Sequence, residues 1–298
     1  MIDIYLLGTG GMKPLYNRYL TGLWVEHDGK ALLVDCGEGM QIAAAKCGRS
    51  LAKLEALFIT HFHTDHIAGL PGLLLSAGNF GKTSPLKIYA PEGAEEIIPK
   101  LMCICPELPF ETELHTVSDG FSADVCGLKV DAMAVRHRIP CFAYRFTEKR
   151  KAVFLPERAK ALGVPVEMWK RLHSGESCET ENGVITADMV TDGIRKPLIV
   201  TYMTDTIYFK ELSDFARGSN LLICEGMYAD DEYIPKMKEK GHMVFSQAAA
   251  VASDAGAEKL WLTHYSPALE NPEQYSGYVK SLFSEAAVSS DGQHIEIR

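Results

Sequence analysis

Residues 54–66 read LEALFITHFHTDH, and the last six of them contain three histidines and an aspartate. The first part, from Leu54 to Thr60, is short, mostly apolar and partly β-branched, which predicts a buried strand. Residues 67–75 predict the beginning of a helix, so the cluster falls on the loop between them. Imidazole nitrogens and carboxylate oxygens are the ligands that zinc and similar divalent metals prefer. Packed core histidines or a surface turn would not need the HxHxDH spacing, so this stretch predicts a metal site.

Three further candidate ligands stand at or just after the ends of other predicted strands. They are His137, Asp205 and His264, each preceded by an apolar, β-branched run. These runs alternate with amphipathic helical segments, which is typical of α/β layers. Because strand ends along one edge of a sheet lie close together, we expect the three residues to share a site with the cluster at 61–66.

The composition is that of an ordinary globular protein. The chain has 298 residues, 47% of them hydrophobic and 23% charged. No apolar run reaches the ~18 residues that cross a bilayer, and residues 1–8 lack the basic start of a signal peptide. The eight cysteines form no CxxC pair, which favours reduced thiols. We therefore expect a cytoplasmic protein without membrane association.

The charge of the chain is unevenly distributed. The net charge of −9 is unfavourable for a nucleic-acid binder. Between Arg145 and Arg171, however, eight Lys and Arg residues stand against three Glu residues. A solvated helix face is one explanation of such a run. From residue 149 to residue 196 the strand and helix pattern also loosens, which predicts an inserted arm with helices and a hairpin.

The stretch His61–His66, followed by AGLPGLL at residues 68–74, resembles the signature of the metallo-β-lactamase superfamily. Within that superfamily the chain most resembles the ribonuclease Z branch, the endonucleases that trim 3′ trailers from precursor tRNA. The resemblance runs from Leu6 to about Ser266. It implies an α/β fold, the αββα four-layer sandwich, as a single domain over residues 1–298 with the inserted arm at residues 149–196.

The resemblance also implies a metal centre with a shared ligand. His61, His63 and His137 would hold one metal, while Asp65, His66 and His264 hold the second and Asp205 bridges the two. Asp35 would brace the metal loop through hydrogen bonds without binding metal itself. Redox-active diiron relatives carry a carboxylate at the position of His63. Histidine there favours two Zn²⁺ ions and hydrolysis, with Mn²⁺ or Fe²⁺ as alternatives.

Two metals suit attack on a phosphodiester, and further residues match roles in ribonuclease Z. Asp65 would orient the attacking water, and His242 paired with Glu225 would supply a proton to the leaving group. Four residues are predicted to contact RNA phosphates: Arg18, Lys149, Arg150 and Lys151. These features predict a homodimeric, metal-dependent endoribonuclease that acts on precursor tRNA.

The chain departs from the ribonuclease Z pattern at two positions of a loop that grips RNA in that family. Tyr16 and Tyr19 replace a lysine and an asparagine, and they would either stack on bases or pack. One alternative is therefore a small-molecule phosphodiesterase, sulfatase or esterase with the same fold and metals. A second is a non-catalytic RNA-binding protein with a structural metal. A thioester or lactone hydrolase is a third, since it would not require His242.

Overall fold

A computed structural model describes residues 1–150, 152–181, 183–193 and 195–298 of the chain. The chain divides into two compact units. The first contains residues 1–148 and 198–298 and is called the sandwich below. The second contains residues 149–197 and is called the arm. Within the described residues, no helix is both long and apolar enough to cross a membrane.

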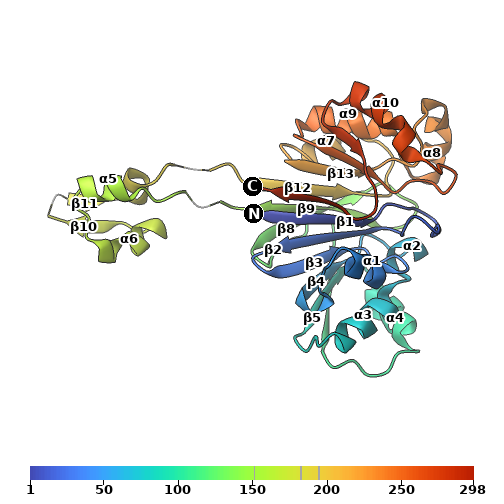
Figure 1. Cartoon of the computed structure of the whole chain (residues 1–298), viewed down its shortest axis with the longest axis horizontal. Helices are drawn as coiled ribbons and strands as arrows, with labels where there is room; N and C mark the ends of the chain where they lie inside the picture. Colours follow the sequence, from blue (N-terminus) through green and yellow to red (C-terminus); the bar gives the residue numbers. More distant parts are fainter. Residues whose placement is uncertain (151, 182, 194) are drawn as a thin grey trace. The chain divides into compact units, whose positions relative to one another are not determined.

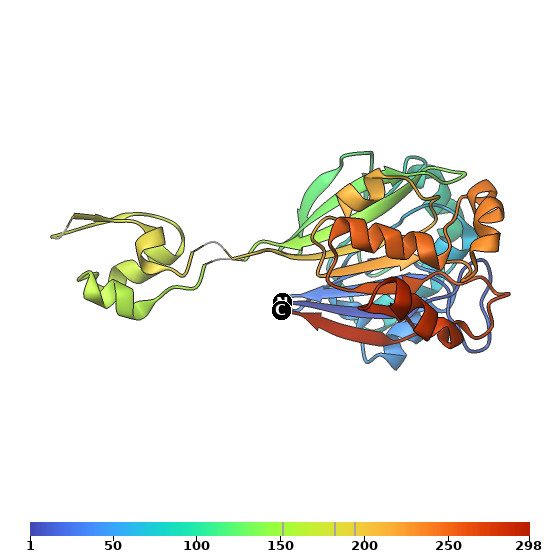
Figure 2. The same cartoon turned by 90° about the horizontal axis from the view of Figure 1, so that it is seen from above.

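The sandwich is built on two seven-stranded sheets, each with parallel and antiparallel pairs (Figures 1 and 2). In the first sheet the strands lie in the order β16 (Gln293–Ile297), β1 (Ile2–Gly8), β2 (Gly22–His27), β3 (Lys30–Val34), β4 (Leu54–Phe58), β5 (Leu86–Ala90) and β6 (Thr112–Thr116). In the second sheet the order is β15 (Ala286–Val288), β14 (Leu260–Thr263), β13 (Leu221–Glu225), β12 (Leu198–Met203), β9 (Cys141–Glu148), β8 (Leu128–Val135) and β7 (Ser122–Val125).

The inner faces of the two sheets pack on one another because their inward positions are apolar. Phe58 of β4, for example, lies edge-on to Tyr144 of β9, with ring centroids 5.2 Å apart. The same buried cluster contains Leu6 of β1 and Val200 of β12. Burial of such side chains contributes roughly 1.5–3 kcal/mol each, so this layer holds the two sheets together.

Helices cover the outer face of each sheet. Against the first sheet lie α1 (Met40–Lys46), α3 (Leu70–Asn79) and α4 (Ala94–Met102). Against the second lie α7 (Glu211–Phe215), α9 (Phe245–Ala255) and α10 (Ser276–Leu282). The remaining helical elements of the sandwich are η1 (Leu51–Lys53), α2 (Thr64–Ile67), η3 (Asp231–Tyr233), α8 (Ile234–Lys240) and η4 (Pro272–Tyr275). Helix, sheet, sheet and helix form four layers, so the predicted αββα architecture is confirmed.

The arm has its own elements and its own small core. Its elements are α5 (Pro156–Ala161), α6 (Val166–His173), β10 (Cys178–Thr180), β11 (Gly183–Ile185) and η2 (Ala187–Val190). Strands β10 and β11 form an antiparallel hairpin in which Glu179 pairs with Val184. Buried Ala159 of α5 and Leu172 of α6 belong to one apolar cluster with Ile185 of the hairpin.

Candidate metal centre

The candidate ligands all lie at the carboxyl ends of strands, where open α/β sheets place their ligand sites. His61, His63, Asp65 and His66 follow β4, and His137 follows β8. Asp205 follows β12, and His264 comes directly after β14. Strands from both sheets therefore contribute to the centre.

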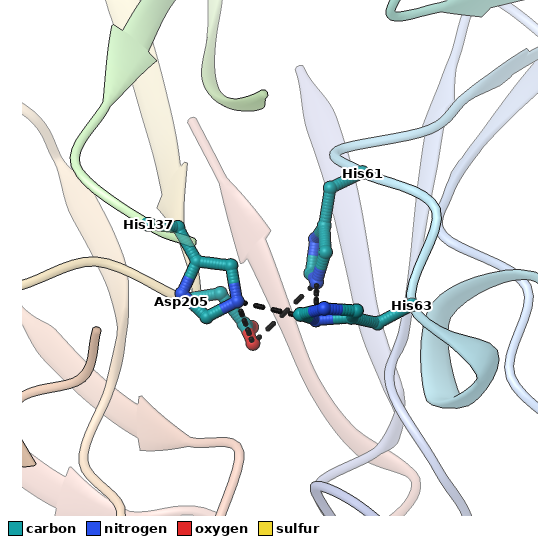
Figure 3. A group of neighbouring side chains, drawn as sticks. All are labelled: His61, His63, His137 and Asp205. Carbon is teal, nitrogen blue, oxygen red and sulfur yellow. Dashed lines mark hydrogen bonds and ion pairs between the residues drawn. The ribbon is translucent and has the colours of Figure 1, made fainter. Parts of the chain in front are cut away.

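The first ligand group joins His61, His63, His137 and Asp205, whose side chains point toward one another in Figure 3. Nε2 of His61 lies 3.0 Å from Nδ1 of His63, and Nε2 of His137 lies 3.2 Å from the same atom. The Oδ2 atom of Asp205 lies 3.6 Å from His61 and 3.8 Å from His137. A tetrahedral zinc ion with bonds of about 2.0–2.1 Å separates its ligand atoms by roughly 3.3–3.4 Å. The spacing of these donors fits such an ion.

The second group joins Asp65, His66 and His264, and Asp205 belongs to it as well. Nε2 of His66 lies 3.2 Å from Nε2 of His264, and Oδ2 of Asp65 lies 3.4 Å from the latter atom. The Oδ1 atom of Asp205 is 3.2 Å from both imidazoles. Asp205 therefore turns one carboxylate oxygen toward each ligand group.

The electrostatics of the site also suit cations. Burial lowers the pKa of His61 well below its ordinary value, with His66 adding to the effect, so the ring stays neutral. Burial alone would raise the pKa of Asp205, but His264 and His66 outweigh it and hold that pKa well below its ordinary value. Burial works to lower the pKa of His66, but the carboxylates of Asp205 and Asp35 outweigh it and raise that pKa well above its ordinary value. The buried carboxylates therefore draw positive charge to this site, and a divalent metal would supply that charge once the histidine has given up its proton. The residues present therefore fit the metals that the sequence predicts.

Three residues of the site adopt a backbone conformation that the sequence does not predict. Asp35, Asp205 and His264 have φ angles of +61°, +48° and +58°. Left-handed backbone is uncommon outside glycine and persists where the surrounding structure enforces it. The chain therefore turns sharply at these strand ends and directs each side chain inward.

Hydrogen bonds to the outward nitrogens fix two of the imidazoles. His66 donates from Nδ1 to Oδ2 of Asp35 over 2.8 Å, which leaves Nε2 facing the site. His137 donates from Nδ1 to the carbonyl oxygen of Gly241 over 2.9 Å. Such outer contacts set the tautomer and the ring orientation of a ligating histidine. The contact of Asp35 is the one expected for a bracing carboxylate.

Two glycines, which sequence reasoning did not assign to the site, allow close approach to these rings. A Cβ atom at Gly11 would lie 2.6 Å from Cε1 of His264, and one at Gly241 would lie 2.6 Å from Nδ1 of His137. The glycine-rich turn after β1 therefore serves to pack on a candidate ligand. Its next residue, Met12, donates its backbone N–H to Oδ2 of Asp65 over 2.6 Å.

His242 and Glu225 form a buried pair beside the two ligand groups. Nδ1 of His242 lies 3.0 Å from Oε2 of Glu225 and 3.9 Å from Oδ2 of Asp205. Burial of the ring works to lower the pKa of His242, but the carboxylate of Glu225 outweighs it and raises that pKa to about 9. The pair therefore keeps a proton on His242.

Arg18, a predicted substrate contact, is a buried residue of the loop after β1. Its guanidinium is buried and donates to the carbonyl oxygens of Leu269 and Glu270, at distances of 3.0–3.1 Å. With these donors engaged, Arg18 anchors the loop after β1 to the loop after β14. The contact of Arg18 with phosphate stays a prediction, and the structure adds the contacts of its guanidinium with these two carbonyl oxygens.

The other predicted substrate contacts are in part open to solvent. Lys149 is exposed and Arg150 is half-buried, while the predicted contact Lys151 lies outside the described residues. Tyr16 is fully exposed. Tyr19 is half-buried, and the ammonium of Lys46 lies 4.9 Å from its ring centroid. Of the two tyrosines, Tyr19 packs, and Tyr16 is free to stack.

Comparison with known proteins agrees with this fold and site. The profile of the family described as "Beta-lactamase superfamily domain" matches residues 30–265. The structure of the metallo-β-lactamase fold protein YhfI from Bacillus subtilis is 21% identical over 99% of this chain and 98% of that chain, with a TM-score of 0.70. The short form of human tRNase Z is 24% identical over 99% of both chains, also with a TM-score of 0.70. The chain is thus a member of the β-lactamase superfamily.

Curated relatives narrow this class. Ribonuclease Z of Agathobacter rectalis is 43% identical over 100% of this chain and 98% of its own length. Ribonuclease Z of Lachnoclostridium phytofermentans is 42% identical over the same shares of the two chains. The chain belongs to the ribonuclease Z family. The predicted family and the predicted class of enzyme, a metal-dependent hydrolase of ribonuclease Z type, are confirmed.

Proposed function

We propose that the chain is a dizinc phosphodiesterase that removes the 3′ trailer from precursor tRNA by cutting after the discriminator base. The observation that carries this proposal is the pair of ligand groups that share Asp205, with His242 and Glu225 beside them. The ribonuclease Z relatives support the choice of RNA over other phosphodiesters.

Each ligand group would hold one of the two metal ions. His61, His63 and His137 would hold one Zn²⁺. Asp65, His66 and His264 would hold the other, with Asp205 between the two groups. When bound, two such ions lower the pKa of water and offset negative charge on the phosphate. Asp65 keeps its carboxylate at the centre through the N–H of Met12, so it is placed to orient the attacking water.

His242 would give a proton to the departing alkoxide of the discriminator nucleotide. Glu225 engages Nδ1 of the ring, so Nε2 is the nitrogen available to the leaving oxygen. Water adds to phosphorus and releases one proton to the solvent, the bond from phosphorus to the leaving oxygen breaks, and the proton on Nε2 of His242 completes the new hydroxyl. Such proton transfer contributes about 10²–10⁴-fold to the rate.

The arm, residues 149–197, would hold the RNA outside the metal centre as an insertion in a single catalytic domain. Lys149 and Arg150 at its beginning offer positive charge to phosphates, and Lys151 is proposed with them from the sequence. The arm would act in a cytoplasmic homodimer in which one subunit's arm serves the other subunit's site.

The test is cleavage of a 3′-extended precursor tRNA by zinc-loaded protein, with His63→Ala as the control. A single cut after the discriminator base, lost in the variant, would establish the proposed reaction. Zinc-dependent hydrolysis of a small phosphodiester without any cut in the tRNA would show that the metal centre is right and the substrate wrong. Zinc binding without either activity would support the alternative of a non-catalytic RNA-binding protein with a structural metal.

A further inference from the structure

Thr60 lies between strand β4 and the ligand His61, and all of its polar groups are engaged although it is fully buried. Its backbone N–H donates to Oδ1 of Asp35 over 2.8 Å. Its carbonyl oxygen accepts the N–H of Phe142, from the second sheet, over 3.1 Å. Any buried residue at this position would have to pair its backbone groups, so what is particular to the threonine is its hydroxyl.

The hydroxyl of Thr60 faces three polar side chains. Oγ1 lies 2.9 Å and 3.0 Å from the two oxygens of Asp35. It lies 3.0 Å from Nδ1 of His61 and 3.4 Å from Nδ1 of His66. A hydroxyl has one proton to donate and two lone pairs that accept. Asp35 also accepts the backbone N–H of Thr60 and faces Nδ1 of His66, so we assign the hydroxyl proton to Asp35. The hydroxyl oxygen then accepts the Nδ1–H of His61.

These assignments fix the tautomers of one histidine in each ligand group. His61 carries its proton on Nδ1, so its Nε2 lone pair faces His63 and Asp205 in the first group. Asp35, braced by Thr60, accepts the Nδ1–H of His66, so Nε2 is the nitrogen of His66 that faces the second group. One hydroxyl thus contacts a histidine of the first group directly and is linked to a histidine of the second group through Asp35. Sγ of Cys141 also lies 3.5 Å from Nδ1 of His61.

We propose that Thr60 is a positioning residue that couples the two metal-binding groups, by orienting His61 directly and His66 through Asp35. The inference rests on the proposed pair of metals. Its consequence is that loss of the hydroxyl weakens both metals together, whereas loss of an outer contact to a single ligand weakens one.

The chain offers a matched control at a second strand end. Thr263 also ends a strand, is fully buried and directly precedes a ligand, His264. Within the part of the chain that the structure describes, its hydroxyl has no hydrogen-bond partner. Thr263→Val therefore makes the same chemical change beside the same centre without breaking a contact.

The experiment measures zinc content by mass spectrometry and zinc affinity by chelator competition in four proteins: wild type, Thr60→Val, Thr60→Ser and Thr263→Val. We expect Thr60→Val to bind both ions about 10- to 100-fold more weakly, the usual effect of losing an outer contact of a metal ligand. We expect Thr60→Ser, which keeps the hydroxyl, and Thr263→Val to stay close to wild type. Should Thr60→Val not fold, Thr60→Ala removes the hydroxyl without placing a methyl group against Asp35.

Three results would overturn the coupling. They are unchanged affinity for both ions in Thr60→Val, weakening of one ion alone, and an equal loss in Thr60→Ser, which would assign the effect to the methyl group. A wild-type protein that binds fewer than two zinc ions would contradict the proposed dizinc function itself and the coupling with it.

Discussion

The sandwich and the arm differ in how much core holds them. In the sandwich, a large apolar layer lies between two sheets, and further clusters lie under the helices on both sides. The arm packs α5, α6 and a short hairpin on one small cluster. Small cores give marginal stability, whereas a metal centre needs donors held within fractions of an ångström. The difference suggests that the sandwich carries the chemistry and the arm carries binding that tolerates motion.

The largest expected effect comes from removing the ligand shared by the two groups. Asp205→Ala should lower kcat/KM by at least about 10⁴-fold, because metal ions supply most of the barrier reduction in such hydrolyses. The loss should be equal for precursor tRNA and for bis(p-nitrophenyl) phosphate, since the change lies in the sandwich. Steady-state kinetics on both substrates, with zinc content measured in parallel, checks this. A loss confined to tRNA would place Asp205 in substrate binding.

The His242→Ala variant distinguishes the contribution of the proton donor from that of the metal ligands. We expect a fall of about 10²–10⁴-fold in tRNA cleavage and little change with bis(p-nitrophenyl) phosphate, whose nitrophenolate departs without a proton. Glu225→Gln should reproduce a smaller part of the loss, because it keeps the shape and removes the charge that holds the proton on His242. An equal loss on both substrates would instead assign His242 to the metal centre.

A substitution in the core of the arm should unfold the arm while the sandwich stays folded. Leu172→Ala removes a fully buried side chain from the arm's core and should cost about 2–5 kcal/mol, which is as much as a unit of this size can lose. Hydrogen exchange should then show lost protection in residues 149–197 alone, with tRNA cleavage reduced and turnover of the small phosphodiester retained. Val166→Ala, an exposed change on the same helix α6, is the control. Loss of protection in both units together would refute their independence.

The smallest effect belongs to the basic residues where the arm begins. Lys149→Ala combined with Arg150→Ala should raise KM for tRNA several-fold and leave kcat unchanged, because phosphate contacts position the substrate. Each lost contact should also reduce the slope of log affinity against log salt by about 1. Lys100→Ala, which removes an exposed charge from α4 of the sandwich, is the control. An unchanged slope of log affinity against log salt would show that Lys149 and Arg150 do not contact RNA phosphates.

The sequence predicts most of the centre because its chemistry is local. His61, His63, Asp65 and His66 fall within six residues, and the remaining ligands end apolar runs whose strand character is plain. The resemblance that this stretch carries implies the family, and through the family the four layers. The left-handed backbone at Asp35, Asp205 and His264 leaves no such signal, because no glycine marks those turns and tertiary packing imposes them.

Contacts between residues that are remote in the sequence leave no local signal. The carbonyl oxygens that Arg18 binds are about 250 residues away from it. Thr60 reads as a β-branched strand residue, and its role depends on Asp35, 25 residues earlier. Only the folded chain shows that the donors of Arg18 are engaged and that the hydroxyl of Thr60 is shared.

The pairing of β1 with β16 has a consequence for biosynthesis. Residue 2 pairs with residue 297, so β1 has an unpaired edge until nearly three hundred residues have left the ribosome. Unpaired strand edges invite association with other chains, and contacts between remote residues slow folding. The half of the molecule that carries His61–His66 is therefore translated early and completed last, which makes the nascent chain a candidate for chaperone protection during that interval.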